Sequence, residues 1–239
     1  MNLLVPAPRD EENNKAYACR VLRMNIMTLR LAPGESLNEN ELCALLNMSR
    51  TPVHEALSAL RDEWLVDVLP KKGTRVSRIE PALVKEGYNT RLLLESDLLQ
   101  DSAGKLGRNQ VQQLLDCLRR LELLQNQLPD RVDDFIRLDD ELHRMIYFFG
   151  GRSHTWYAMR GLVSHYDRLR YLDALEGNVD FDRITRQHRE FCDYLLMGVP
   201  EGVDLRRKVQ EHMTSFKGNL LERMLQHPDF FSIGSPELP

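Results

Sequence analysis

Four side chains in the second half of the chain have the types and the spacing to bind a divalent metal. The segment L-D-D-E-L-H places Asp139 and His143 four residues apart, so on a helix the carboxylate and the imidazole share one face. His188 and His212 follow in two later segments with helical patterns. One oxygen and three nitrogens suit zinc, nickel or manganese and leave coordination positions for another ligand.

Each part of this set also has a simpler interpretation. A D-x-x-x-H pair on a helix is commoner as a surface ion pair, and a single histidine is usually a hydrogen-bonded polar group. Sequence spacing alone does not bring three helices together, so a metal site requires a helical bundle. We interpret His154 and His165 as structural and His227 as part of a tail.

A second set of residues, nearer the N-terminus, has the chemistry to contact DNA. Ser49, Arg50, Thr51 and Pro52 begin a helical pattern, followed by His54 on its polar face. Hydroxyls, free backbone N–H groups and a guanidinium at the positive end of a helix suit phosphate oxygens and base edges. Pro52 is tolerated because the first helical turn has no partner for its missing N–H. A solvated helix start is the alternative.

The elements that must position these residues follow from the apolar periodicity. Residues from about 14 to 29 predict a first helix. Asn38 caps a second, which should bury Leu42, Leu45 and Leu46, and Asn47 ends it. Ser49 starts a third as its N-cap, and the pattern changes after Trp64. Strands at 65–69 and 74–79 predict a hairpin, whose turn would carry Lys71, Lys72 and Gly73 to a sugar-phosphate chain. Together they predict a winged helix-turn-helix.

From Pro81 onward only helical patterns remain. They lie at roughly 82–104, 108–127, 130–149, 153–175, 181–198 and 202–226. The predicted fold class is therefore mainly α: a winged helix-turn-helix at 1–78, an all-helical antiparallel bundle at 79–227, and a loose tail at 228–239. The linker between the two domains is the short segment 77–81.

The composition fits a globular protein that meets DNA only through its N-terminal part. The 239 residues are 42% hydrophobic and 28% charged, with a net charge of −4. Residues 1–78 carry a net +1 and the remainder −5. No apolar run approaches the ~18 residues that span a bilayer, so we expect a cytoplasmic chain without a membrane partner. The four cysteines are widely spaced, which favours buried thiols over disulfides.

The stretch from Ala16 to Val76, with S-R-T-P-V-H-E-A-L and P-K-K-G-T-R-V, closely resembles the DNA-binding domain of GntR-family bacterial transcription regulators. The resemblance implies that Arg50 reads guanine, that Thr51 holds phosphate, that Ser49 caps the helix and that Gly73 is the wing glycine. The family usually has arginine at His54, basic residues near Ser58 and glycine at Trp64. These departures predict an altered base preference or weaker binding.

The region 84–213 looks like the all-helical ligand-binding domain, abbreviated FCD, of the FadR subfamily. Many members hold a divalent metal with an Asp and three His in the order seen here, although the V-P-E-G connection before His212 is slightly longer than usual. In that subfamily a small carboxylate completes the metal shell, helped by an arginine whose position matches Arg91. An ion pair between Arg91 and Glu95 is the alternative for that arginine.

These features predict a non-enzymatic, homodimeric DNA-binding regulator, a repressor rather than an activator. A small carboxylate effector bound at the metal would control its binding to double-stranded operator DNA. Two alternatives stay open. One is a regulator that senses the metal itself, and the other is a metal-dependent hydrolase, since a metal held by His and Asp can activate water.

Overall fold

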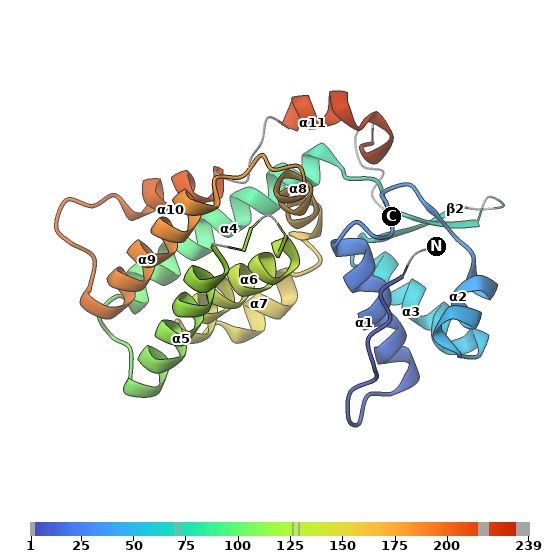
Figure 1. Ribbon diagram of the computed structural model, residues 1–239, viewed down its shortest axis with the longest axis horizontal. Helices are drawn as coiled ribbons and strands as arrows, with labels where there is room; N and C mark the ends of the chain where they lie inside the picture. Colours follow the sequence, from blue (N-terminus) through green and yellow to red (C-terminus); the bar gives the residue numbers. More distant parts are fainter. Residues whose placement is uncertain are drawn as a thin grey trace. The chain divides into compact units, whose positions relative to one another are not determined.

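The computed structural model is mainly helical, with a small three-stranded sheet near the N-terminus (Figure 1). This confirms the predicted fold class. The structure describes residues 3–69, 71, 73–125, 127–128, 130–214 and 220–232.

The chain forms two compact units, each assembled from more than one segment of the sequence. The first unit comprises Met1–Lys85, Arg160–Tyr171 and Leu220–Pro239, and the second comprises Glu86–Met159 and Leu172–Asn219. The first unit therefore contains segments from the end of the chain as well as its beginning, which a division into consecutive sequence ranges does not express.

A winged helix-turn-helix makes up most of the first unit. Its elements are α1 (Asn14–Met27), β1 (Ser36–Leu37), α2 (Glu39–Leu46), α3 (Arg50–Asp62), β2 (Val66–Leu69) and β3 (Gly73–Val76). The strands are antiparallel in the order β1-β3-β2. Apolar residues at helical spacing on α1 and α3, among them Leu22, Ile26, Val53 and Leu57, bury the core. The strand β1 was missed because two residues are too few to show alternation.

The ends of the short helix α2 follow the expected chemistry. The Asn38 side chain accepts hydrogen bonds from the backbone N–H groups of Asn40 and Glu41, and Asn47 closes the helix with a left-handed backbone at φ 52°. The prediction that Leu45 is buried is wrong, since its side chain is 41% exposed. α2 has only two turns, and the side of the helix that carries Leu42 and Leu46, four residues apart, is the side that faces the core of the first unit.

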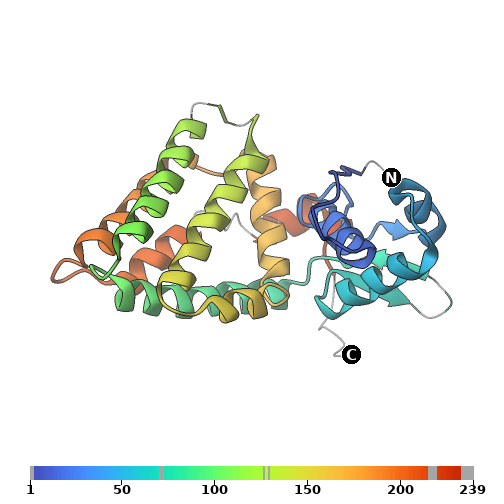
Figure 2. The same ribbon diagram turned by 90° about the horizontal axis from the view of Figure 1, so that it is seen from below.

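Eight further helices follow the sheet. They are α4 (Pro81–Ser102), α5 (Arg108–Gln125), α6 (Val132–Phe149), α7 (Ser153–Met159), α8 (Ser164–Leu175), α9 (Phe181–Met197), α10 (Leu205–Met213) and α11 (Leu220–Gln226). In the second unit α5 packs against α6 and α9, forming the helical bundle seen in Figure 2. Within the part of the chain that the structure describes, none of the helices combines the length and apolar character needed to cross a bilayer.

One of the predicted helices is divided into two. The pattern at 153–175 forms α7 and α8, separated by a turn that includes Gly161, a residue with low helix propensity. Hydrophobic periodicity continued through this turn, so the sequence pattern did not reveal it. The pattern at 202–226 contains α10, which starts where the Asp204 side chain accepts from the N–H of Arg207, and α11; residues 215–219 between them lie outside the described residues.

The segment between β3 and α4 is held by two buried side chains of α8. The fully buried Arg168 donates to the carbonyl of Ser77 (2.7 Å) and to its hydroxyl (3.1 Å). His165 Nδ1 accepts from the N–H of Glu80 at 2.9 Å, and its Nε2 lies 3.2 Å from the carbonyl of Trp64. Burial and the neighbouring Arg168 hold the pKa of His165 well below its usual value, so its ring is neutral and has a lone pair for Glu80.

Residues 228–232, directly after α11, are packed, contrary to the predicted loose tail in this part of 228–239. Residues Pro228–Phe230 form a 3-10 turn, and Phe231 is 1% exposed and pairs with Ile79 in a parallel bridge. Two hydrogen bonds fix this pairing, from the N–H of Ile79 to the carbonyl of Phe230 (2.8 Å) and from the N–H of Ser232 to the carbonyl of Ile79 (3.1 Å). The remaining seven residues of the predicted tail lie outside the described residues.

All four cysteines are free thiols, as the sequence predicted. Burial raises the pKa of Cys117 to about 12, and it also raises the pKa of Cys192 far above its usual value. Both thiols on the bundle helices are therefore protonated and unreactive near neutral pH.

The packed C-terminal segment gives a stability prediction. Phe231→Ala removes a fully buried aromatic ring and should lower the free energy of unfolding by about 3–5 kcal/mol. Leu225→Ala, six residues earlier on an exposed face of α11, is the control and should change stability by less than about 0.5 kcal/mol. Urea unfolding followed by the fluorescence of the two tryptophans measures both, and equal midpoints for the two variants would mean that this segment does not pack.

Candidate functional site

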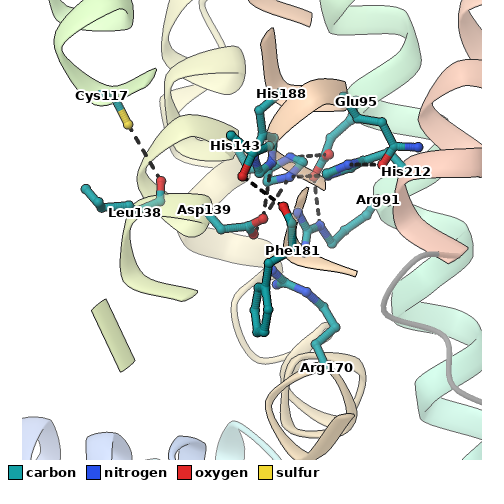
Figure 3. Close-up of polar contacts among 12 residues, drawn as sticks. Arg91, Glu95, Cys117, Leu138, Asp139, His143, Arg170, Phe181, His188 and His212 are labelled. Carbon is teal, nitrogen blue, oxygen red and sulfur yellow. Dashed lines mark hydrogen bonds and ion pairs between the residues drawn. The ribbon is translucent and has the colours of Figure 1, made fainter. Parts of the chain in front are cut away.

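Asp139, His143, His188 and His212 converge inside the second unit. They come from three helices, α6, α9 and α10, and all four are almost completely buried. One ligand atom from each lies within 4.8 Å of the others. Figure 3 shows the four side chains directed toward one another. The structure thus brings together the four residues that the sequence nominated.

The distances among the donor atoms fit a single metal ion. His143 Nε2 and His212 Nε2 are 3.0 Å apart, His188 Nε2 and Asp139 Oδ1 are 3.2 Å apart, and His143 Nε2 and Asp139 Oδ2 are 3.8 Å apart. A metal 2.0–2.2 Å from four tetrahedral donors keeps those donors roughly 3.3–3.6 Å apart. The cluster therefore has the size and the nitrogen and oxygen chemistry of a divalent metal site.

The environment of His212 favours the neutral form that binds metals. Burial, followed by the nearby His188 and His143, holds the pKa of His212 well below its usual value. A neutral imidazole has a lone pair on one ring nitrogen, which a protonated ring lacks. His212 therefore has a lone pair near neutral pH, without the need to remove a proton first.

Two residues outside the cluster contact its histidines, and neither was expected from the sequence to do so. Glu95 Oε2 lies 2.7 Å from His143 Nδ1, and Gln187 Oε1 lies 3.2 Å from His212 Nδ1 (Figure 3 shows Glu95). In each case the oxygen contacts Nδ1, which leaves Nε2 to face the cluster. No sequence motif marks either residue; Glu95 was considered only as a partner for Arg91.

Arg91 lies beside the cluster on α4, where it is buried and paired with Glu95. Its Nε donates to Glu95 Oε1 at 2.8 Å, one helical turn away. Burial alone would raise the pKa of Glu95, but Arg91 and then His143 outweigh burial and lower it to about 2, so the carboxylate is ionised. The ion pair that the sequence left as an alternative is present.

The residues nominated for DNA contact lie on the surface of the first unit, at the start of α3. Ser49, Arg50, Thr51 and His54 are exposed and Pro52 is half-buried, while Val53 and Leu57 on the opposite face enter the core. Ser49 has the extended backbone of an N-cap residue, although its hydroxyl makes no capping hydrogen bond. The N-terminus of α3 thus presents its polar groups outward.

Glu39, in the first turn of α2, organises this surface and was not singled out by the sequence. Its two carboxylate oxygens contact Arg50 Nε at 2.9 Å and His54 Nδ1 at 3.0 Å. The hydrogen bonds with His54 and Arg50 lower the pKa of Glu39. The Arg50 side chain remains 75% exposed, so the pairing fixes its direction without covering it.

The wing keeps the expected geometry as far as it is described. β2 and β3 pair from Val66↔Val76 to Leu69↔Gly73, and both Lys71 and Gly73 are exposed. Gly73 has φ 95°, a conformation that favours glycine, and open space lies where a side chain would begin. Lys72 falls outside the described residues. Trp64 also has a positive φ, 61°, which explains why a glycine would suit that position.

An open depression joins the beginnings of α1 and α3. Its lining residues are Asn13, Asn14, Lys15, Ser49, Thr51, Pro52 and Glu55. The backbone N–H groups of two helix starts and one lysine favour phosphate here, while Glu55 disfavours it.

Two family models match the chain over the same two regions. Residues 16–76 match the bacterial regulatory proteins of the gntR family, and residues 86–215 match the FCD domain. The first match covers the three helices and the wing, and the second covers all four residues of the metal cluster together with Arg91 and Glu95.

Individual proteins with similar sequences or structures are also regulators. The chain is 34% identical to an HTH-type transcriptional regulator in an unstable DNA locus of Streptomyces ambofaciens, covering 91% of this chain and 89% of that protein. It is 27% identical to the HTH-type transcriptional repressor RspR of Escherichia coli K12, covering 94% and 96%. The crystal structure of a GntR regulator from Rhodococcus sp. RHA1 shares the fold, with a TM-score of 0.72, 18% identity and coverage of 87% and 97%.

The cluster geometry predicts that a metal stabilises the native chain through Asp139. Adding Zn²⁺ at about 100 times its dissociation constant to metal-free protein should raise the melting temperature by roughly 5–10 °C. Asp139→Asn should abolish most of this rise, because it removes the only carboxylate among the four donors. Asp134→Asn, on the same helix but paired with Arg131 on the surface, should retain it. A rise of the same size in Asp139→Asn would exclude this residue as a ligand.

Proposed function

Because the chain belongs to the gntR family of bacterial regulatory proteins and carries an FCD domain, we propose that it is a repressor controlled by a small carboxylate bound at a divalent metal. In this proposal residues 1–78 bind operator DNA and residues 79–227 bind metal and effector. The convergence of Asp139, His143, His188 and His212 in one buried cluster is the observation that carries it.

The DNA-binding half of the proposal depends on the exposed start of α3. Arg50 would read a guanine in the major groove, while Ser49, Thr51 and the N–H groups around Pro52 contact phosphates. His54, Lys71, Lys72 and Gly73 would contact the neighbouring backbone or base edges. Glu39 supports this assignment, because it aims both Arg50 and His54 away from the core.

The sensing half depends on charge. With zinc, nickel or manganese bound, the cluster would gain a dication that only the Asp139 carboxylate offsets directly, and Arg91 adds a guanidinium nearby. Such a pocket favours an anion that can bind in bidentate fashion, which is the chemistry of a small carboxylate. The metal supplies an open coordination position for that carboxylate.

The name of one relative supports repression. RspR of Escherichia coli, which aligns over nearly the full length of both chains, is called a repressor. We extend this assignment to the present chain, with operator binding released by the effector. The family and the relatives are transcriptional regulators and not enzymes, which removes the hydrolase alternative. A regulator of this kind acts on the chromosome, so we place it in the cytoplasm.

We assign the link between sensing and DNA binding to the segment 77–80 and the helix α8. His165 and Arg168 on α8 hold that segment by three strong hydrogen bonds, and α8 continues past the boundary of the first unit at Tyr171. A homodimer would place two α3 helices in successive major grooves of a near-palindromic site. A change in the spacing of the two helices then weakens binding, and a coupling of about 1–3 kcal/mol suffices.

A charge deletion at Arg50 tests the DNA-binding assignment. Arg50→Ala should weaken binding to an operator selected from random duplex DNA by roughly 10–100-fold, since it removes a bidentate contact with guanine. It should also relax the preference at that base pair. Arg120→Ala, an exposed arginine on α5, should leave the affinity unchanged. Unaltered affinity and unaltered preference in Arg50→Ala would rule out the proposed groove contact.

Effector release tests the sensing assignment and separates it from direct metal sensing. Small sugar acids and dicarboxylates are first screened for a rise in melting temperature with Zn²⁺ and with chelator. An acid that acts only with metal should then weaken operator binding by about 5–150-fold, measured by fluorescence anisotropy. The same acid should have no effect on Asp139→Asn. If Zn²⁺ alone changes operator affinity and no acid changes it further, the chain senses the metal.

A further inference from the structure

Two buried charges of opposite sign face each other on α4, one turn apart and beside the metal cluster. Arg91 and Glu95 are both almost completely withdrawn from water, although the hydration of a charged group is very favourable. Such burial persists only where each charge has close partners. The residues that contact Glu95 therefore indicate the role of its carboxylate.

Glu95 divides its two oxygens between two different residues. Oε1 accepts from Arg91 Nε at 2.8 Å, and Oε2 faces His143 Nδ1 at 2.7 Å (Figure 3). A carboxylate that is paired with a guanidinium can only accept, so Nδ1, the imidazole nitrogen that faces it, is the one suited to carry a proton. That leaves Nε2, the nitrogen that faces Asp139 and His212, as the one suited to hold a metal.

We propose that Glu95 is a positioning residue of the metal centre, which fixes the tautomer and direction of His143 while it holds Arg91 beside the same cluster. This inference rests on the proposed function and deepens it. The Glu95 carboxylate then links Arg91, which would receive an anionic effector, to His143, which would bind the metal. A charged acceptor on Nδ1 also makes Nε2 a stronger electron donor, which favours a dication.

A comparison with His212 indicates which of the two contacting residues, Glu95 or Gln187, should contribute more to metal affinity. His212 Nδ1 faces the neutral amide oxygen of Gln187 at 3.2 Å, whereas His143 Nδ1 faces a carboxylate at 2.7 Å. A close contact with an ionised carboxylate is electrostatically stronger than a hydrogen bond to a neutral amide oxygen. Loss of Glu95 should therefore weaken metal binding more than loss of Gln187.

A simpler role for Glu95 is to neutralise the buried Arg91 and nothing more. The two roles separate in a chain that lacks Arg91. Arg91→Met removes the guanidinium, and the double variant Arg91→Met/Glu95→Leu then replaces the pair with apolar side chains of similar size, an exchange that proteins often tolerate. If Glu95 serves only Arg91, the single and double variants bind metal equally well.

The experiment measures Zn²⁺ affinity of the full-length chain by competition with a coloured chelator. The double variant should bind Zn²⁺ 10–100-fold more weakly than Arg91→Met, the range expected for loss of a residue that orients a metal-binding histidine. Should Arg91→Met fail to fold, Glu95→Gln is compared with the wild type and should lose affinity in the same direction. Glu141→Gln is the control; it lies two residues from His143 but faces Arg120 outside the cluster, and its affinity should not change.

A second readout follows the proton itself in the metal-free chain. Long-range ¹H–¹⁵N correlation spectra should show His143 protonated on Nδ1 in the wild type and not predominantly so in the Glu95 variants. Equal Zn²⁺ affinity in Arg91→Met and the double variant, or an Nε2-protonated His143 in the wild type, overturns the inference and leaves the proposed metal site intact. A wild-type chain that binds no Zn²⁺ overturns both.

Discussion

The exclusion of water from one group of ionisable side chains is the constraint on which the second unit depends. Arg91, Glu95, Asp139 and three histidines share one core, and each must be compensated there because removal of a single ion from water is costly by several kcal/mol. Arg91 and Glu95 form an ion pair, and burial holds the pKa of His212 well below its usual value. Asp139 adds a second carboxylate, whose Oδ1 lies 3.2 Å from His188 Nε2. In the proposed function a metal bound at this centre would link metal affinity to the stability of the fold.

The first unit also groups an arginine, a histidine and a glutamate, but there the arginine and histidine side chains are exposed to water instead of buried. Arg50, His54 and Glu39 form a group of charges and hydrogen bonds at the start of α3, but here Arg50 and His54 are largely exposed. Exposed ion pairs contribute little to stability, so their geometry is free to serve recognition instead. In the proposed function, Glu39 would give the Arg50 guanidinium a direction before DNA binds, which would lower the conformational entropy lost on binding. The short helix α2, closed at both ends by asparagine, holds Glu39 in place.

Much of the fold and the membership of the buried Asp-His cluster could be predicted from the sequence. The periodicity around Val53 and Leu57 and the caps at Asn38 and Asn47 act over a few residues, so they are visible in a single chain. The four donors could be nominated, but their convergence depends on the packing of α6, α9 and α10, and spacing along the chain does not contain it. Glu95 and Gln187 were missed for the same reason, since each meets its histidine from another helix. The packing of Phe231 against Ile79 joins residues 152 apart in sequence, so no local pattern announced it.

Anomalous X-ray diffraction at the zinc absorption edge, from crystals of the zinc-loaded chain, tests the proposed metal site most directly. We expect one anomalous peak per chain, about 2.0–2.2 Å from Nε2 of His143, His188 and His212 and from a carboxylate oxygen of Asp139. Glu95 should lie against the opposite nitrogen of His143. A peak at another position, or histidines that turn away from a common centre while zinc is bound elsewhere, would contradict the account.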